Sequence, residues 1–400
     1  MNTIVAEAKR IQKELAEHRQ ALHKHAECGF DLQKTAHYVE TTLKAYGISA
    51  TPCGKSGVIA DMGGGNIKNC VLLRADMDAL PMQERSGEPF ACKTGNMHAC
   101  GHDLHTAMLL GAAKLLKARE KELNGRVRLL FQPAEECLEG AKDMIEHGAL
   151  ENPQPQAAIM LHVLTNTELP TGTVVISSPG VSAPAADFFT ITLRGKGCHG
   201  STPWEGRNPL SAAAQIITAL NALAAQEIPV AHGTVLSIGR VHGGEAGNVI
   251  PQTASVSGTA RSFDEEARAR LKKRIKETVL GIAKAYGVQA RTSFTSGCPT
   301  LVNEEGLCER SAQALKSLLG ERKAFAVQEL QGSGTTKRSG GSEDFAYISQ
   351  RIPSVMIAIA AGERAKGYEY PLHHPQALFD EEALSIGAAV YAGLALEFLQ

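Results

Sequence analysis

Residues 97–105 read Met97-His98-Ala99-Cys100-Gly101-His102-Asp103-Leu104-His105 and hold three histidines, one cysteine and one aspartate. An apolar run that suits a helix, Thr106-Ala107-Met108-Leu109-Leu110-Gly111-Ala112-Ala113, follows at once. Cysteine supplies a thiolate and histidine a neutral imidazole, and both are ligands that suit zinc and neighbouring divalent metals. The segment therefore predicts a metal site on a loop that leads into a helix.

A structural zinc site is a poorer interpretation of this segment. Structural sites use two close pairs of cysteine or histidine, and the other cysteines of the chain form no CxxC pair. They are Cys28, Cys53, Cys70, Cys92, Cys137, Cys198, Cys298 and Cys308. The remaining alternative is a polar turn with one buried thiol and ordinary histidines. In a catalytic site, by contrast, the missing ligands come from distant strand ends.

Length and composition favour a two-domain globular protein. The chain has 400 residues, more than one hydrophobic core normally serves. Its formal net charge of -1 offers no basic field to nucleic acid or to an anionic membrane. An odd number of cysteines and a charged, helix-like amino-terminal segment predict reduced thiols and a cytoplasmic location. No apolar run approaches membrane-spanning length.

Strand-like and helix-like segments alternate in the first part of the chain. The first 45 residues have the period of one or two amphipathic helices that end at Gly47. Apolar strands are predicted at 71–74, 127–131, 157–161 and 355–359, and helices at 106–122 and 141–147. This alternation predicts an α/β fold, in which helices cover both faces of a mostly parallel sheet.

A different pattern occupies the middle of the chain. Strands are predicted at 188–193, 235–241, 254–261 and 289–294, and helices at 209–225 and 264–286. This β-α-β-β-α-β order predicts a ferredoxin-like domain. We therefore expect one domain formed by residues 1–183 and 295–400, with a second domain, residues 184–294, inserted between its parts. A Gly/Ser/Thr-rich stretch at 332–342 is expected to be a mobile loop.

Polar residues stand directly after the predicted strands of the first domain. In chain order they are Asp76, Asp78, Glu135, Glu136 and His162. Ligands bind beyond the carboxyl ends of parallel strands, so these side chains are expected to converge on the Cys100 loop. In the adjacent glutamate pair, one carboxylate can bind metal while the other takes a proton from water.

Several of these residues also have an ordinary structural interpretation. The glutamate pair can be a solvated turn, and His162 can be a buried histidine with hydrogen-bond partners. Asp78 can be a turn aspartate, or a carboxylate that orients a ligand histidine. The residues alone do not decide between His373 and His374 as a further ligand. The histidines ranked below Cys100 and His102 as ligands are His98 and His105.

Three residues of the predicted inserted domain suit substrate recognition. His199 lies on a tight turn flanked by glycines, Asn248 precedes Val249-Ile250-Pro251, and Arg261 ends a strand. An imidazole, an amide and a guanidinium together can hold a carboxylate or a developing oxyanion. Taken singly, each is more often a surface or capping residue.

Three motifs together carry a family resemblance. They are the 97–103 segment, Arg74-Ala75-Asp76-Met77-Asp78-Ala79-Leu80-Pro81, and Gln132-Pro133-Ala134-Glu135-Glu136. With His199, residues 248–251, Arg261, residues 341–345 and His373, they extend over nearly the whole chain. The chain resembles the dimetal amidohydrolases of the aminoacylase/carboxypeptidase superfamily of metallopeptidases, such as hippurate hydrolase, N-acyl-amino-acid amidohydrolases and auxin-conjugate hydrolases. It departs from their pattern at Leu104 and Trp204. These differences concern which substrate is bound and not the type of reaction.

The resemblance implies a zinc-exopeptidase-like main domain that binds two divalent ions, of manganese, zinc, cobalt or nickel. The ligands it implies are Cys100, His102, Glu136, His162 and His373. It implies that Glu135 is the general base and that His199 assists the tetrahedral intermediate. Asp78 is a further candidate for the catalytic site, as a carboxylate that can orient a ligand histidine. In related dimers the inserted domain pairs the subunits and this histidine reaches the neighbouring site. Asn248 and Arg261 are the candidates for binding the substrate.

We therefore expect metal-dependent hydrolysis of the amide bond in N-acyl amino acids or similar small conjugates. An aminopeptidase, dipeptidase or carboxypeptidase of the same superfamily is an alternative. A thiol hydrolase with Cys100 as nucleophile and His102 or His105 as its base would leave the glutamate pair unused. A metal-binding or peptide-binding protein without activity would not need Glu135.

Overall fold

The computed structural model describes residues 2–64, 69–330 and 340–400, and it divides into two compact units. The first unit runs to Ser182 and resumes at Val302, and the second comprises Ala183–Leu301 with a short segment that ends at Glu343. Most of the Gly/Ser/Thr-rich stretch, residues 332–339, lies outside the described residues. None of the described helices is long and apolar enough to span a bilayer.

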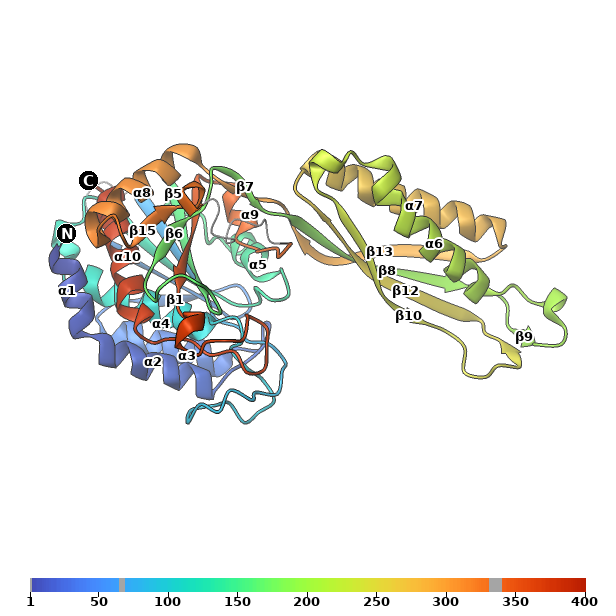
Figure 1. Cartoon of the computed structure of the whole chain (residues 1–400), viewed down its shortest axis with the longest axis horizontal. Coiled ribbons are helices and arrows are strands. Elements are labelled where there is room, and N and C mark those ends of the chain that lie inside the picture. Colours follow the sequence, from blue (N-terminus) through green and yellow to red (C-terminus); the bar gives the residue numbers. More distant parts are fainter. Residues whose placement is uncertain (1, 65–68, 331–339) are drawn as a thin grey trace. The chain divides into compact units, whose positions relative to one another are not determined.

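A central eight-stranded sheet organises the described part of the first unit, in the order β1-β2-β4-β3-β5-β16-β6-β15 (Figure 1). Its strands are β1 (Ala50–Cys53), β2 (Gly57–Gly63), β3 (Cys70–Asp76), β4 (Arg126–Gln132), β5 (Ala157–Leu164), β6 (Val174–Ile176), β15 (Ala324–Ala326) and β16 (Ser354–Ala360). Neighbours from β4 through β3 and β5 to β16 run parallel, as do β6 and β15. The pairs β1–β2, β2–β4 and β16–β6 are antiparallel. The fold is thus mixed α/β with a largely parallel central sheet, as the sequence predicted.

The central strands are buried along their whole length because their sequences are nearly continuous apolar runs. Every residue of β3 is buried, and β5 is buried from Ala157 to Leu161. Parallel strands covered on both faces have this composition. Polar residues are therefore concentrated where these strands end, at Asp76 and His162.

The helices of the first unit begin with three, rather than one or two, in the first 45 residues. The chain breaks at Ile11 and again at Gly29, whose φ of 59° suits glycine. The helices are α1 (Asn2–Arg10), α2 (Gln12–Lys24), α3 (Gln33–Ala45), α4 (His102–Lys117), α5 (Gly140–Glu146), α8 (Glu305–Leu319), α9 (Ala346–Ser349) and α10 (Ala383–Phe398). Helices α4 and α10 pack against each other and against β3, which places the start of α4 beside the strand ends.

The second unit contains a four-stranded antiparallel sheet in the order β10-β12-β8-β13. Its elements follow the chain as β8 (Ala185–Arg194), α6 (Pro209–Glu227), β10 (Val235–His242), β12 (Thr253–Ser262), α7 (Glu265–Ala285) and β13 (Gln289–Cys298). Asn208 and Asp264 cap the two helices by accepting hydrogen bonds from backbone N–H groups. The apolar faces of both helices share one core with the sheet. Two short pairs complete the strands: β9 (Cys198–His199) with β11 (Val249–Ile250), and β7 (Gly180–Ala183) with β14 (Leu301–Asn303).

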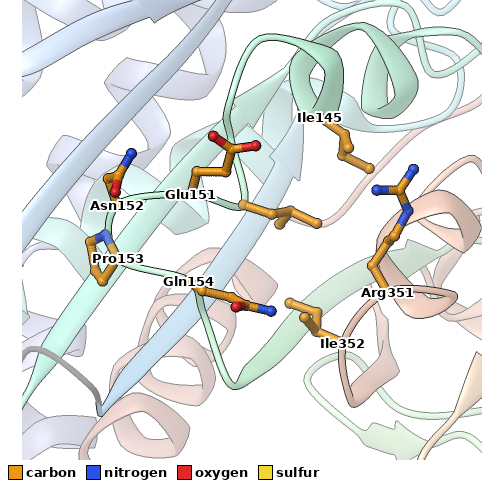
Figure 2. Close-up of a pocket in the computed structure, with 8 residues that line it drawn as sticks. Ile145, Glu151, Asn152, Pro153, Gln154, Arg351 and Ile352 are labelled. Atoms are coloured by element: carbon orange, nitrogen blue, oxygen red, sulfur yellow. The ribbon is translucent and has the colours of Figure 1, made fainter.

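A surface cleft lies at the amino ends of β5 and β16 (Figure 2). It is lined by Ile145, Leu150, Glu151, Asn152, Pro153, Gln154, Arg351 and Ile352. The carboxyl ends of these parallel strands, at Leu164 and Ala360, lie at the other edge of the sheet. The cleft is therefore separate from the polar residues that follow the strands.

Candidate active site

The Cys100 segment reaches the sheet through a left-handed glycine. Gly101 has a φ of 80° and precedes α4, which begins at His102. A Cβ atom at Gly101 would lie 2.4 Å from Cγ2 of Val163 on β5. Glycine at this position therefore allows the backbone to approach β5 and directs Cys100 and His102 to the same region.

Cys100, His102 and His162 form a first group of potential ligands. Their ligand atoms all lie within 4.8 Å of one another. The Cys100 sulfur is 3.6 Å from Nε2 of His162. Nδ1 of His162 donates to the carbonyl oxygen of Val163 at 2.8 Å, which fixes the ring orientation and turns Nε2 toward the group. A hydrogen bond of this kind on the outer nitrogen is typical of metal-binding histidines.

A second group shares Cys100 and adds Glu136 and His373. Nε2 of His373 lies 3.2 Å from the Cys100 sulfur and 3.3 Å from Oε1 of Glu136. His373 has a φ of 62°, a strained conformation for a residue with a side chain. The structure thus brings together all five residues that the resemblance implies as ligands, in two groups that overlap at one thiol.

His102 is buried beside two carboxylates. Neither of its ring nitrogens has a hydrogen-bond partner among the described residues. Nδ1 lies 3.4 Å from Asp78 and Nε2 lies 3.7 Å from Asp76. Burial opposes protonation, but the two carboxylates outweigh it and raise the pKa of His102 well above its usual range. An imidazole must give up its proton to bind a metal, and the same two carboxylates would then favour a metal cation on the ring.

Cys100 is poised to ionise. Burial raises the pKa of a thiol, but the charge of His162 and hydrogen bonds from the surrounding histidines outweigh it and lower the pKa of Cys100 to about 6. The thiolate is the form of cysteine that binds metals. The same histidines can therefore stabilise the thiolate before a metal binds.

Glu135 and Glu136 are presented by a tight turn after β4. Ala134 and Leu138, on either side of the pair, have φ values of 53° and 57°. The two oxygens of the Asp78 carboxylate accept hydrogen bonds from the backbone N–H groups of Glu135 and Glu136, at 3.1 and 3.2 Å. Asp78 therefore positions the glutamate pair, in addition to lying beside His102. Glu135 is itself within 4.8 Å of potential ligand atoms of His102 and Glu136.

Of the two rival histidines, His105 lies beside the ligands and forms a further potential group with Asp76 and His102, and His98 lies in none of the groups among the described residues. His105 is fully buried, with Nδ1 2.5 Å from Oδ1 of Asp76 and Nε2 accepting from the backbone N–H of Val163 at 2.9 Å. Both of its nitrogens are thus used by protein groups. Both nitrogens of His98 lack partners among the described residues, and its ring lies 5.9 Å from that of His23 rather than among the grouped ligands.

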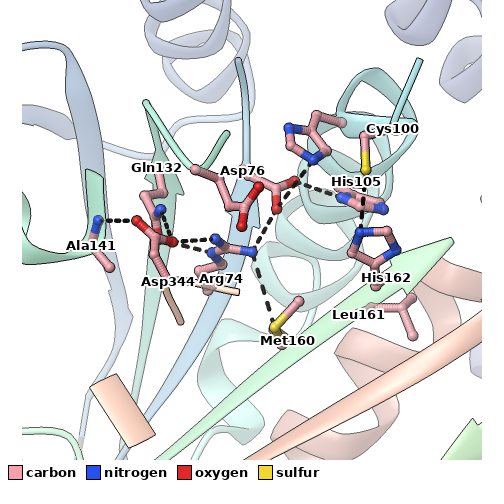
Figure 3. A network of polar contacts seen from close by, with 12 residues as sticks. Arg74, Asp76, Cys100, His105, Gln132, Ala141, Met160, Leu161, His162 and Asp344 are labelled. Atoms are coloured by element: carbon pink, nitrogen blue, oxygen red, sulfur yellow. Dashed lines mark hydrogen bonds and ion pairs between the residues drawn. The ribbon is translucent and has the colours of Figure 1, made fainter. Parts of the chain in front are cut away.

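A buried ionic network that sequence reasoning missed supports the site (Figure 3). The guanidinium of Arg74 contacts Asp76 at 2.6 Å, Asp344 at 3.1 Å and the side-chain oxygen of Gln132 at 2.9 Å. Asp344 also accepts from the Gln132 amide at 2.6 Å and the Ala141 N–H at 2.9 Å. The one available signal was an arginine inside an apolar strand, since a buried charge requires a partner. Its partner Asp344 is 270 residues away along the chain.

His199, Asn248 and Arg261 belong to the second unit. His199 is on β9, where Nδ1 accepts from the hydroxyl of Ser201 at 2.7 Å and from its N–H at 3.1 Å. The carbonyl of Asn248 accepts from the N–H of Gly200 at 2.7 Å, so both residues belong to one exposed pair of short strands. Arg261 donates to the carbonyl of Gly340 and to the hydroxyl of Ser342. These contacts show that its guanidinium also holds the chain at 340–342.

Comparison with known proteins connects this geometry to a family. Residues 72–397 match the sequence model of Peptidase family M20/M25/M40. An N-acetyl-L-cysteine deacetylase of Bacillus subtilis is 36% identical over 376 residues, covering 94% of this chain and 85% of that protein. The IAA-amino acid hydrolase ILR1-like 4 of Arabidopsis thaliana is 36% identical over 387 residues, covering 95% and 84%.

A solved structure extends the likeness to three dimensions. The crystal structure of the Bacillus subtilis YXEP protein, a dinuclear metal binding peptidase from the M20 family, aligns with a TM-score of 0.78 and 33% identity. The alignment covers 98% of this chain and 99% of that one. The fold and the sequence thus match the same family along nearly the whole length.

Proposed function

We infer that this chain, a member of the peptidase family M20/M25/M40 and a metal-dependent hydrolase of amide bonds, cleaves N-acyl amino acids or similar small conjugates. Two divalent ions would take part in the reaction. One observation carries the proposal: two groups of potential ligands overlap at Cys100, and Glu135 lies beside them. Deacetylase and auxin-conjugate hydrolase relatives support a small acylated amino acid as the substrate class.

The proposed ligands divide between the two groups. His102 and His162 would hold one ion and Glu136 and His373 the other, and Cys100 belongs to both groups. Such ions polarise a carbonyl group and lower the pKa of water toward neutrality. Thiolate, imidazole and carboxylate together suit manganese, zinc, cobalt or nickel.

Glu135 is the proposed general base. Its carboxylate would accept a proton from the attacking water and return it to the leaving amine. Asp78 holds the backbone of Glu135 by a hydrogen bond, so the base has a fixed position. In this assignment Glu136 is a metal ligand and Glu135 transfers the proton.

The second unit supplies the remaining proposed roles. Its strand order and element order support its assignment as a ferredoxin-like domain, residues 184–294 in the sequence prediction, that acts as a lid and pairs two chains. His199 would stabilise the oxyanion, within its own chain or in the partner's site. Arg261 and Asn248 would bind the substrate carboxylate. We propose that the enzyme is cytoplasmic and forms a homodimer or a higher homo-oligomer through this domain.

A thiol hydrolase is the second candidate, and the lowered pKa of Cys100 favours it. A thiolate at neutral pH can attack an amide directly, with a neighbouring histidine as acid. Chelation separates the two mechanisms, whereas alkylation of Cys100 would stop both. Removal of metal should abolish a metal-dependent reaction and readdition should restore it, whereas a thiol hydrolase would survive chelation.

A substrate panel tests the proposed function. The purified enzyme, reconstituted with Mn²⁺ or Zn²⁺, is assayed on N-acetyl and N-benzoyl amino acids, on their amides without a carboxylate, and on dipeptides and longer peptides. The proposal expects the highest kcat/KM on the N-acyl amino acids. Higher kcat/KM on unblocked peptides would instead establish a peptidase.

A further inference from the structure

Strands β3 and β5 stop pairing next to the candidate site, although both continue. Their ladder ends where Arg74 faces Met160. β3 stays paired with β4 as far as Asp76, and β5 stays paired with β16 as far as Leu164. The sheet therefore contains a local split between its two central strands. Asp76 lies on one side of the split and His162 on the other.

The hydroxyl of Tyr391 on α10 fills the first position of this split. The backbone N–H of Leu161 donates to the Tyr391 oxygen at 3.0 Å, and that hydroxyl donates to the carbonyl of Arg74 at 2.6 Å. With Arg74 opposite Met160, a continuous parallel ladder would join the Leu161 N–H to the Arg74 carbonyl directly. A fully buried phenol has thus been inserted into a strand-to-strand hydrogen bond.

His105 on α4 makes a second link between the two strands, from the backbone of β5 to a side chain of β3. Its Nε2 accepts from the backbone N–H of Val163 on β5, so Nδ1 carries the proton and donates to Asp76 on β3. Figure 3 shows His105 between Asp76 and His162. The Tyr391 hydroxyl thus stands in for one step of the sheet ladder, and beyond it His105 joins the Val163 N–H to the Asp76 carboxylate, while the Asp76 carbonyl accepts from the Thr106 hydroxyl.

We propose that Tyr391 and His105 are positioning residues that hold β3 and β5 apart and thereby set the distance between His162 and the carboxylates beside His102. The inference rests on the proposed dinuclear function. A sheet closed at this point would bring the Leu161 N–H to the Arg74 carbonyl and draw His162 toward β3. His162 is the next residue after Leu161, so the hydrogen bond between the Leu161 N–H and the Tyr391 hydroxyl also determines where His162 lies.

The Tyr391→Phe variant tests the first spacer because it removes the hydroxyl and keeps the ring that packs in the core. Metal-free wild-type and variant chains are titrated calorimetrically with Mn²⁺, and folding is checked by circular dichroism. We expect one of the two ions to bind 10–100-fold more weakly, the usual effect of removing support for a ligand. Tyr38→Phe is the matched control, since the Tyr38 hydroxyl contacts His18 and none of the proposed ligands. Its Mn²⁺ affinity should equal that of the wild type.

Each outcome decides the proposal. Wild-type affinity for both ions in a folded Tyr391→Phe chain would overturn it and leave the proposed function intact. Failure of the wild-type chain to bind two ions would overturn both. If Tyr391→Phe does not fold, His105→Ala and His105→Gln decide, because glutamine retains a donor and an acceptor. Affinity lost in the alanine variant and partly rescued in the glutamine variant supports the spacer, and equal affinities in both refute it.

Discussion

The Asp78 carboxylate links two parts of the candidate site at the scale of single residues. It accepts from the N–H groups of both Glu135 and Glu136 while one oxygen lies 3.4 Å from His102. Burial raises the pKa of Asp78. Asp78 holds the backbone of both glutamates, so their side chains can take different roles.

Replacement of Glu135 by glutamine separates the base from the ligands. The side chain keeps its shape but no longer accepts a proton, so kcat should fall by about 10²–10⁴-fold. Bound metal, measured by atomic emission, should stay at the wild-type level. Glu136→Gln is the companion variant and should lose metal instead. Wild-type turnover by Glu135→Gln would refute the assignment of the base.

The sequence predicted the residues of the candidate site, but not the buried residues that hold them in position. Polar residues after apolar strands predicted that Cys100, His162 and the glutamate pair would converge, because parallel strands end at one edge. The choice of His373 over His374 came only from the family resemblance. Arg74 with Asp344, and Tyr391 with Arg74, join residues far apart in the chain, and no local pattern encodes such pairs.

At the scale of elements, a buried ionic cluster fastens α2 to the start of α4. Asp103, the neighbour of His102, accepts from Arg19 at 3.1 Å and from His23 at 2.8 Å. The other ring nitrogen of His23 lies 3.1 Å from Glu84. Burial opposes protonation of His23, but Asp103 and Glu84 outweigh it and raise its pKa to about 9. The protonated ring thus joins three segments of the chain.

This cluster predicts a defined pH dependence of stability. Because the pKa of His23 is about 9 in the folded chain and about 6.5 when unfolded, protonation favours folding. The contribution is complete below pH 6.5 and disappears as the pH rises through about 9. The difference in thermal midpoint between wild type and His23→Gln, measured by calorimetry on metal-free protein, should shrink across this range. A difference that stays constant or grows with pH would contradict the assignment.

Substitution of Gly101, at the junction between the loop and α4, should lower the stability of the fold. Alanine there would adopt a left-handed conformation that costs about 1–2 kcal/mol, and its Cβ would also clash with Val163. We expect Gly101→Ala to lower the thermal midpoint and to weaken metal binding. Gly281→Ala in α7 is the control, since no atom lies within 4 Å of its Cβ position and alanine favours helix. Equal midpoints for the two variants would show that Gly101 is not required.

Elements were predictable where their period was strong. Buried strands and the helices of the second unit follow from their hydrophobic patterns, and the structure adds that Asn208 and Asp264 cap those helices. The break at Ile11, which makes three helices of the first 45 residues, has no proline or glycine to mark it. The helix predicted from residue 106 begins four residues earlier, at His102. Its first turn is polar and gives no helical hydrophobic pattern, and its position depends on the close approach of Gly101 to β5.

At the scale of the whole molecule, the proposed roles are shared between two units. The candidate ligands and Glu135 belong to the first unit, and His199, Asn248 and Arg261 to the second. If His199 serves the neighbouring chain of a dimer, Glu135→Gln and His199→Ala chains should complement each other. Mixing the two inactive variants under conditions of subunit exchange should restore part of the activity. Absence of rescue after exchange is verified by mass spectrometry would show that His199 does not act across the dimer.

The most direct test of the account is activity measured against bound metal. Metal-free enzyme is titrated with Mn²⁺ while hydrolysis of an N-acyl amino acid and ions bound per chain are followed in the same samples. We expect no activity without metal and full activity at two ions per chain, and we expect Cys100→Ala to fail to bind both ions. Full activity without metal, or at one ion per chain, would contradict it.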